Sequence, residues 1–336
     1  MKKKLLASML TVTMLFTCGV SVYASESSTY SSTSNFGVAT YNVGTNETNI
    51  EVLPESTLDS SVSDPYSPAL TPSADLEMDE TTKSTLDEMG LLTDDDEFDF
   101  SAFSELPTLD DSANDIMPYS VIGTDERTVV SDTTATPWRW ICYLAATFPN
   151  GNTYRGTAFT MGPSVVGTCG HNLYGSDKGG WATSVVIIAA RNDSTQPYGT
   201  ASGTLFHVGQ GWYDSSTQNE DWGMVELSSE LGNTVGYFGM AIKDSSFVGS
   251  NATVAGYPKE VQSYTNSYQM WTHSNPITSL TNNMWHYTID TTGGNSGSPI
   301  YIDGGYVIGI HAYGSSSSNS GRALDQGLYN FFMNYR

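Results

Sequence analysis

The stretch T-T-G-G-N-S-G-S-P-I, residues 291–300, is the part of the sequence on which the fold assignment depends. Its glycines permit backbone conformations that other residues disfavour, so the stretch predicts a tight loop. Such a loop can expose one hydroxyl and point backbone N–H groups into one hollow, as a nucleophilic serine requires. Ser296 is therefore the predicted nucleophile, and the N–H groups of Gly294 and Ser296 form the predicted oxyanion hole. A surface turn has the same composition, so the loop alone leaves both interpretations open.

A nucleophilic serine needs a neighbouring base and a carboxylate that orients the base. Among five histidines, His171 has the most informative context, because the apolar run V-V-G leads into the turn T-C-G-H. Asp221 begins the apolar run D-W-G-M-V-E-L, where a partly buried carboxylate can orient an imidazole. Glu220 and Asp214 are weaker alternatives, since neither directly precedes that run. Three of the remaining four histidines, His207, His273 and His286, are expected to be structural or exposed.

The order His171, Asp221, Ser296 is that of chymotrypsin-type proteases, and differs from the order in subtilisin-like enzymes and α/β-hydrolases. The three motifs T-C-G-H, E-D-W-G-M-V-E-L and G-N-S-G-S-P are similar to that family's T-A-G-H, its D-x-A-hydrophobic-V-hydrophobic pattern and its G-D-S-G-G-P loop. The sequence therefore resembles a chymotrypsin-fold serine protease. The resemblance implies two six-stranded antiparallel β-barrels, with a C-terminal helix predicted at 326–335.

Within that fold, the sequence resembles the bacterial glutamyl endopeptidases of staphylococci and Bacillus. This resemblance implies a pocket in which Thr291 and His311 contact a glutamate side chain, with the free amine of the mature start near Val121 close by. Burying a substrate carboxylate costs several kcal/mol unless it is paired, and these three groups meet that need. A histidine on a strand is more often simply packed, which is the alternative for His311. The matching stretches are 121–128, 168–171, 256–259, 291–299 and 307–311.

Asn295 stands where trypsin-like enzymes carry the Asp that pairs with the new N-terminal amine. That pairing cannot form in this chain, so the amine must bind elsewhere. The resemblance permits a mature start at Ser120 or Val121, and a start at Val121 gives the amine its matched position. No acidic residue directly precedes either bond, so an activating protease is expected rather than self-cleavage at glutamate.

Composition divides the 336 residues into three parts. Residues 1–24 combine three lysines, an apolar run and a small-residue cleavage site, and predict a signal peptide, hence secretion without a membrane anchor after cleavage. Residues 25–119 carry 21 acidic residues against one basic residue and few aromatics, which predicts a largely disordered acidic propeptide with one short helix at 76–92. Residues 120–336 are also net acidic, so a nucleic-acid partner is not expected.

The predicted protease domain, 120–336, contains many short β-rich runs separated by turn residues, which indicates an all-β fold. Cys142 and Cys169 remain after signal cleavage and could form one disulfide or two separate buried thiols. There is no C-x-x-C pair, so no metal or cofactor is expected. The predicted strands are 140–148, 158–161, 165–168, 181–189, 203–207, 222–227, 252–257, 268–272, 284–289, 299–302 and 306–310.

The sequence as a whole predicts a secreted, monomeric serine endopeptidase, made as a zymogen, that cleaves after glutamate and less readily after aspartate. Its expected partners are substrates with Glu at the cleavage site and an activating protease. Two alternatives stay open. One is the same fold with a different primary specificity, and the other is a catalytically silent secreted adhesin or toxin on a protease scaffold.

Overall fold

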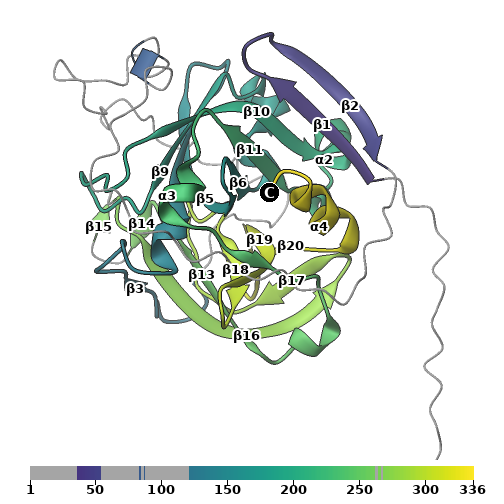
Figure 1. Cartoon of the computed structure of the whole chain (residues 1–336). Helices are drawn as coiled ribbons and strands as arrows, with labels where there is room; N and C mark the ends of the chain where they lie inside the picture. Colours follow the sequence, from purple (N-terminus) through teal and green to yellow (C-terminus); the bar gives the residue numbers. More distant parts are fainter. Residues whose placement is uncertain (1–35, 54–82, 85–86, 88–120, 262–263, 266–267) are drawn as a thin grey trace, which may run out of the picture. The chain divides into compact units, whose positions relative to one another are not determined.

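The computed structural model describes residues 36–53, 83–84, 87, 121–261, 264–265 and 268–336 (Figure 1). The predicted signal peptide and Ser120 lie outside these residues. The barrels and the C-terminal helix belong to one compact unit, Asn35–Arg336. Residues 83, 84 and 87 are helical, and they fall inside the helix predicted at 76–92. Within the described part of the chain, every helix is too short or too polar to cross a membrane.

The first barrel is a closed six-stranded antiparallel sheet. Its strands follow the order β11-β6-β5-β4-β9-β10, and pairing between β10 and β11 closes it. Runs such as S-V-V-I-I-A at 184–189 are buried along their whole length, because a closed barrel covers one face and its neighbours cover the other. The strands are β4 (Ile141–Thr147), β5 (Thr153–Gly162), β6 (Val165–Thr168), β9 (Ser184–Ala189), β10 (Ala201–Gly209) and β11 (Gly223–Leu227).

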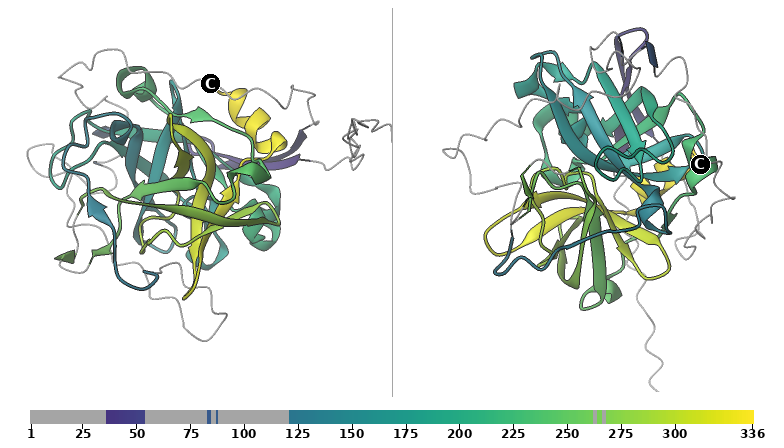
Figure 2. Two further views of the ribbon diagram at one scale, coloured as in Figure 1. Left: turned by 90° about the horizontal axis from the view of Figure 1, so that it is seen from below. Right: turned by 90° about the vertical axis from the view of Figure 1, so that its left-hand side faces the viewer.

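The second barrel repeats this plan with the order β19-β18-β13-β16-β17-β20, closed by pairing between β19 and β20. The right-hand view of Figure 2 shows the teal strands of the first barrel above the green and yellow strands of the second. The predicted pair of six-stranded antiparallel barrels is confirmed. The strands are β13 (Asn251–Gly256), β16 (Trp271–Thr281), β17 (Met284–Tyr287), β18 (Pro299–Ile302), β19 (Tyr306–Gly314) and β20 (Asn319–Ala323).

Two strands of the second barrel differ from the sequence-based prediction. The strand expected at 268–272 is β16, which begins at Trp271 and ends at Thr281. It is longer at its C-terminal end because its polar continuation pairs with both β13 and β17. The run N-S-G-R-A of β20 has no β-branched or aromatic residue and was not predicted. Its backbone is held in the barrel by ladders to β17 and β19. Pairing therefore overrides weak strand propensity at both places.

Short elements connect and flank the barrels. Two short helices, α2 (Gln210–Ser215) and α3 (Leu231–Val235), follow strands of the first barrel. Cys142 and Cys169 are free thiols, and both are buried, so of the two interpretations the separate thiols are correct. The short strands are β3 (Thr128–Val129), β7 (Tyr174–Gly175), β8 (Gly180–Trp181), β12 (Gly239–Met240), β14 (Glu260–Val261) and β15 (Tyr264–Thr265).

The C-terminal helix α4 (Gln326–Met333) begins at a side-chain cap, since Asp325 accepts the N–H of Leu328 at 3.0 Å. Leu328, Phe331 and Phe332 are buried in the core that includes the first barrel. The apolar stripe therefore fixes the end of the chain to the core, as the helical spacing predicted.

Residues 36–53, which lie within the predicted propeptide, form regular secondary structure. They form a hairpin of β1 (Phe36–Asn42) and β2 (Glu47–Leu53), and β1 pairs with β10 of the first barrel. The composition of 25–119 did not predict this hairpin, because an average over a long acidic segment conceals a short run rich in apolar and β-branched residues.

Candidate active site

His171 and Asp221 are brought together by the pairing of β6 with β11. His171 lies on the 3₁₀ turn η3 (Gly170–Asn172) just after β6, and Asp221 lies just before β11. The Nδ1 of His171 is 2.7 Å from Oδ2 of Asp221, and the His171 backbone N–H donates to Oδ1 at 2.8 Å. The weaker alternatives lie elsewhere: Glu220 accepts from the Trp222 indole, and Asp214 accepts from Gln210.

Tyr313 is a third partner of this pair, which the sequence did not identify. Its hydroxyl donates to Oδ2 of Asp221 at 2.5 Å. Burial, and then the charge of Asp221, raise the pKa of Tyr313, so the hydroxyl stays protonated and remains a donor. Asp221 is fully buried, and its oxygens accept bonds from Tyr313 and from both the side chain and the backbone of His171.

The charge of Asp221 controls the protonation of His171. Burial disfavours the imidazolium, but contacts with Cys169 and with Asp221 outweigh it, so the pKa of His171 is raised. Because burial also raises the pKa of Cys169, that thiol is neutral at neutral pH, and Asp221 supplies the negative charge. The Sγ of Cys169 lies 3.4 Å from Nε2 of His171, the nitrogen that faces away from Asp221.

Replacing Tyr313 by Phe is expected to move the acid limb of the kcat/KM profile to higher pH. Without this donor, the Asp221 carboxylate carries more of its charge toward His171 and raises the imidazole pKa further. A base must be neutral, so more of the enzyme is then inactive at a given acidic pH. The plateau falls up to about tenfold, because Asp221 loses an orienting bond.

The matched control for this change is Tyr154→Phe, which removes a tyrosine hydroxyl bonded to Asn150 on the first barrel. Its pH profile should equal that of the parent. An acid limb that stays in place in Tyr313→Phe would show that the Tyr313 bond does not influence His171.

Ser296 is anchored beside His171 through the neighbouring residue. The Nδ2 of Asn172 donates to the Ser296 carbonyl at 2.9 Å, and the N–H of Thr157 donates to the same oxygen at 2.8 Å. The loop from the second barrel is therefore tied to the histidine turn of the first. Within the described part of the chain, Ser296 makes no other hydrogen bond. Its Oγ therefore has no hydrogen-bond partner among those residues. Bonds between nucleophile and base are often completed only when substrate binds.

The loop around Ser296 is shaped by two glycines with positive φ, Gly294 at +95° before it and Gly297 at +87° after it. A Cβ on Gly294 would lie 2.2 Å from the Tyr257 carbonyl oxygen, so only glycine fits there. In the described part of the chain, the N–H groups of Asn295, Gly297 and Ser298 all have acceptors, whereas those of Gly294 and Ser296 donate to no described residue. These two N–H groups are the ones predicted for the oxyanion hole.

The two predicted pocket residues flank this loop. Thr291 lies five residues before Ser296. The backbone of His311 pairs with the loop, since its N–H donates to Ser298 at 2.9 Å and its carbonyl accepts from Gly297 at 2.8 Å. Both side chains are buried, and Thr291 Oγ1 and His311 Nε2 have no hydrogen-bond partner among the described residues. Other buried polar atoms share this property, but these two sit at the nucleophile loop.

The side chain of His311 is a neutral hydrogen-bond donor. The Tyr287 hydroxyl lies 2.6 Å from Nδ1, and as donor it leaves the proton of the imidazole on Nε2. Burial, and then the charge of His171, lower the pKa of His311 to about 3. The unpartnered Nε2–H can therefore donate to an anion without the imidazole first being charged.

The start of the domain is held by Asp290, which the sequence also did not single out. One of its carboxylate oxygens accepts the N–H of Ile122 at 2.7 Å, and the other accepts the N–H of Glu126 at 3.0 Å. Asn295, in the position of the usual Asp, instead accepts the Thr292 N–H at 3.0 Å. The residue after Val121 is therefore tied to the residue before Thr291.

Two groups of potential metal ligands occur among the described residues, Cys169–His171–Asp221 and Glu126–His273–Asp290. In the first, Nδ1 of His171 is bonded to Asp221. In the second, Asp290 accepts two backbone N–H groups, and its own N–H donates to Nδ1 of His273 at 2.8 Å. Their ligand atoms are thus engaged with one another or with the backbone, and neither group matches the sets of ligands around an open position in catalytic zinc sites.

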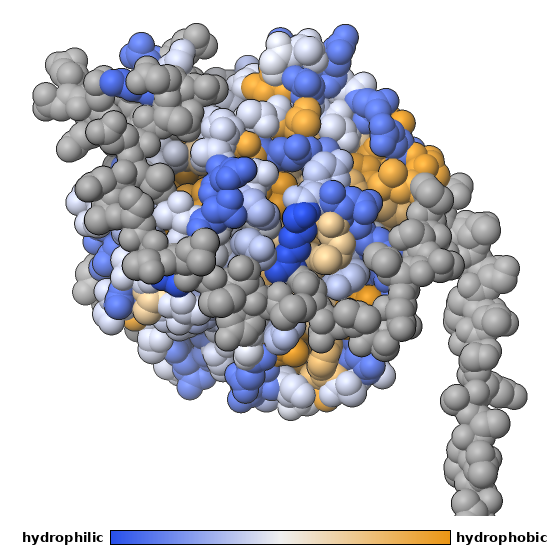
Figure 3. All heavy atoms as spheres, viewed as in Figure 1, coloured by the Kyte–Doolittle hydropathy of each residue, from blue (hydrophilic) through white to orange (hydrophobic). Residues whose placement is uncertain are grey.

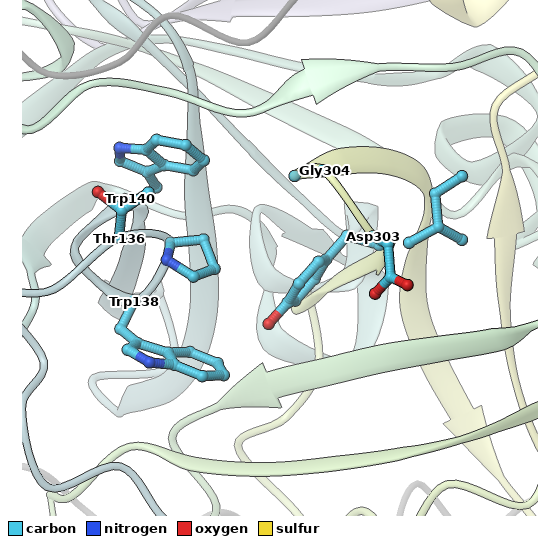
Figure 4. Close-up of a pocket in the computed structure, with 9 residues that line it drawn as sticks. Thr136, Trp138, Trp140, Asp303 and Gly304 are labelled. Atoms are coloured by element: carbon cyan, nitrogen blue, oxygen red, sulfur yellow. The ribbon is translucent and has the colours of Figure 1, made fainter.

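A cavity of about 290 Å³ lies away from these residues. Figure 4 shows the indoles of Trp138 and Trp140 on one side of it and Asp303 on the other. None of the predicted site residues lines it, so the cavity is separate from the candidate active site.

Comparisons with known proteins agree with this geometry. The chain is 35% identical over 233 residues to a protein named Glutamyl endopeptidase from Bacillus licheniformis, covering 65% of this chain and 71% of that protein. It is 39% identical over 228 residues, 66% and 71% of the two chains, to a Bacillus subtilis protein named Extracellular metalloprotease. A solved structure described as Glu endopeptidase in complex with MPD superposes with a TM-score of 0.58 at 30% identity, over 64% of this chain and 98% of that one.

The name of the Bacillus subtilis relative and the family model indicate different classes of protease, and the family model is the more specific of the two. A model described as Trypsin matches residues 129–335, which contain His171, Asp221 and Ser296 and both barrels. The chain therefore belongs to the trypsin family, with its chymotrypsin-like fold, and is a serine endopeptidase.

Proposed function

We propose that this chain is a secreted serine endopeptidase, made as a zymogen, that hydrolyses peptide bonds after glutamate and less readily after aspartate. The observation that carries the proposal is the linked arrangement of three residues. His171 is bonded to Asp221, and the carbonyl of Ser296 is held by the side chain next to His171. These three residues are 50 and 75 positions apart in the sequence, so their convergence depends on the two-barrel fold.

In this proposal, Nε2 of His171 takes the proton of Ser296 as its Oγ attacks the substrate carbonyl. The carbonyl oxygen becomes an oxyanion that the N–H groups of Gly294 and Ser296 stabilise. His171 then gives the proton to the leaving amine, and the acyl-enzyme is hydrolysed by the same steps with water. Asp221 holds the imidazole in the tautomer with its proton on Nδ1 and stabilises the imidazolium.

The specificity part of the proposal rests on the pocket residues and on the relatives. A glutamate side chain at the cleavage site would accept bonds from Thr291 Oγ1 and His311 Nε2, two buried atoms without partners among the described residues. Buried polar groups normally have partners, so unpartnered ones beside a nucleophile loop suggest that a ligand supplies the bonds. Relatives at 35% and 27% identity carry the name Glutamyl endopeptidase.

We further propose that residues 1–24 are a signal peptide, 25–119 a propeptide and 120–336 the protease domain, which acts as a monomer. An activating protease cuts before Val121, or before Ser120. The bonds from the N–H groups of Ile122 and Glu126 to Asp290 support a start at Val121, because they tie the residue after Val121 to the residue that directly precedes Thr291. N-terminal sequencing of the secreted protein distinguishes the two starts.

The experiment that tests the specificity is a panel of fluorogenic peptides that differ only in the residue before the cut. Fastest cleavage is expected after Glu, slower cleavage after Asp, and much slower cleavage after Gln and Leu, because only the carboxylates satisfy the pocket. Equal cleavage after Glu and Gln would contradict the proposal and favour the same fold with a different primary specificity.

A further inference from the structure

The hairpin of residues 36–53 completes an edge of the first barrel. β10 pairs with β9 only at Ala201 and Ser202, and beyond these residues the two strands separate. There β1 takes the place of β9, with Val38 opposite Gly209 and Asn42 opposite Leu205. Without the hairpin, residues 205–209 would present an open strand edge, which folded proteins normally cover. Figure 1 shows β1 alongside β10, with β2 on the outer side of β1.

The hairpin also buries apolar side chains against the protease domain. Val38 is 2% exposed, and Ala39 and Tyr41 are also buried in the shared core. Tyr41 stacks on Trp181 with ring centroids 5.4 Å apart, and Phe36 stacks on Trp222 at 5.5 Å. The outer strand β2 contributes little to this contact: Ile50 and Val52 are 44% and 54% exposed, and Figure 3 shows hydrophobic surface in the region of the hairpin.

One polar contact gives the docked hairpin specificity. The Oγ1 of Thr40 is 2.9 Å from Nδ1 of His207, which is buried on β10. The other ring nitrogen of His207 is 3.0 Å from Glu226, so the hairpin completes the hydrogen bonding of this imidazole. A buried polar group that loses its partner is costly, which opposes loss of the hairpin.

We propose that the hairpin stays bound to the protease domain as a separate chain after the bond before Val121 is cut. This inference rests on the processing step of the proposed function. All the contacts described above join residues 36–42 to residues 181–226, which lie beyond the cut, so none depends on the broken bond. The edge of β10 is then a strand-acceptor site whose ligand is this chain's own propeptide, bound by strand addition. An isolated two-stranded hairpin is marginally stable, so its structure depends on the domain.

The test uses the full chain with Ser296→Ala, which prevents self-digestion, cut by an added protease. N-terminal sequencing first shows whether the bond before Val121 is cut. The products are then separated by size exclusion without denaturant, and the domain peak is analysed by intact mass. A peptide that contains residues 36–53 is expected in that peak in equal amount. Its digestion, or its elution apart from the domain, would overturn the proposal.

Hydrogen exchange on the uncut chain separates docking from processing. Val38→Ala is expected to lower the protection of the amides at 38–42 by about tenfold, since two buried methyl groups are lost from the contact. The matched control is Val52→Ala, the same change on the exposed strand, which should leave that protection unchanged. Amides at 38–42 that exchange as in an unstructured peptide, or equal effects of the two variants, would overturn the docked hairpin whatever the enzyme's specificity.

Discussion

Replacing Ser296 by Ala is expected to lower kcat for a glutamyl peptide by about 10⁶-fold, the loss typical of removing a nucleophile from such a group of residues. The alanine has no Oγ to form the acyl-enzyme, while His171 and Asp221 keep their bond. The residual rate over water comes from the oxyanion hole and substrate binding. The measurement is steady-state hydrolysis after the parent and the variant have been processed in parallel by the same added protease.

Ser298→Ala is the matched control, because Ser298 lies in the same loop and is also buried. Its backbone donates to Asn295 and accepts from His311, while its Oγ has no partner among the described residues. Its activity should stay within about tenfold of the parent, since removing an unbonded hydroxyl leaves the loop backbone intact.

Labelling by a fluorophosphonate gives an independent readout, since only an activated serine reacts. The processed parent and Ser298→Ala should be labelled, and Ser296→Ala should not. Turnover or labelling that survives in Ser296→Ala would place the nucleophile elsewhere. A processed parent that is never labelled would instead favour a silent protease scaffold.

Replacing His311 by Ala is expected to reduce the preference for Glu over Gln, measured as the ratio of kcat/KM, by about 100-fold. A hydrogen bond to a charged group contributes about 1.5–3 kcal/mol, and the upper figure corresponds to roughly this factor. The loss falls on the Glu substrate, because a carboxylate left short of partners in a buried site is destabilised more than an amide. Thr291→Val keeps the shape of the side chain and should reduce the same ratio by about tenfold.

The pH dependence of this preference follows from the state of His311. Burial lowers the pKa of His311 to about 3, so the imidazole is neutral at neutral pH. A bound carboxylate favours the imidazolium and raises that pKa in the complex. Above a pH of about 4.3, where the substrate glutamate is ionised, the preference for Glu therefore falls as pH rises toward the pKa of His311 in the complex, and this dependence should disappear in His311→Ala.

The control for the pocket is His286→Ala. His286 lies on β17 with its Nε2 2.8 Å from Thr281, away from the nucleophile loop, and its loss should leave the Glu to Gln ratio unchanged. An unchanged ratio in His311→Ala itself would contradict the pocket assignment and favour a different source of primary specificity in the same fold.

The class of fold and the tight loop of the candidate site follow from patterns within short stretches of the sequence. Strongly apolar runs such as 184–189 predicted strands correctly, because burial of side chains on both faces requires such runs whatever their neighbours. The glycines around Ser296 predicted a tight loop, since the backbone there needs positive φ and close contacts that only glycine allows. The stripe of Leu328, Phe331 and Phe332 predicted α4. These signals are local, so a single sequence contains them in full.

Which distant groups meet depends on how the whole chain folds. Tyr313 reaches Asp221 from 92 positions away, and Asp290 binds the N–H of Ile122 from 168 positions away. The strand β20 and the hairpin of residues 36–53 likewise depend on ladders to strands elsewhere in the chain. The physical reason is that a hydrogen bond between two segments depends on how the barrels close and pack. That geometry is a property of the whole chain and leaves no periodic pattern at either end of the bond.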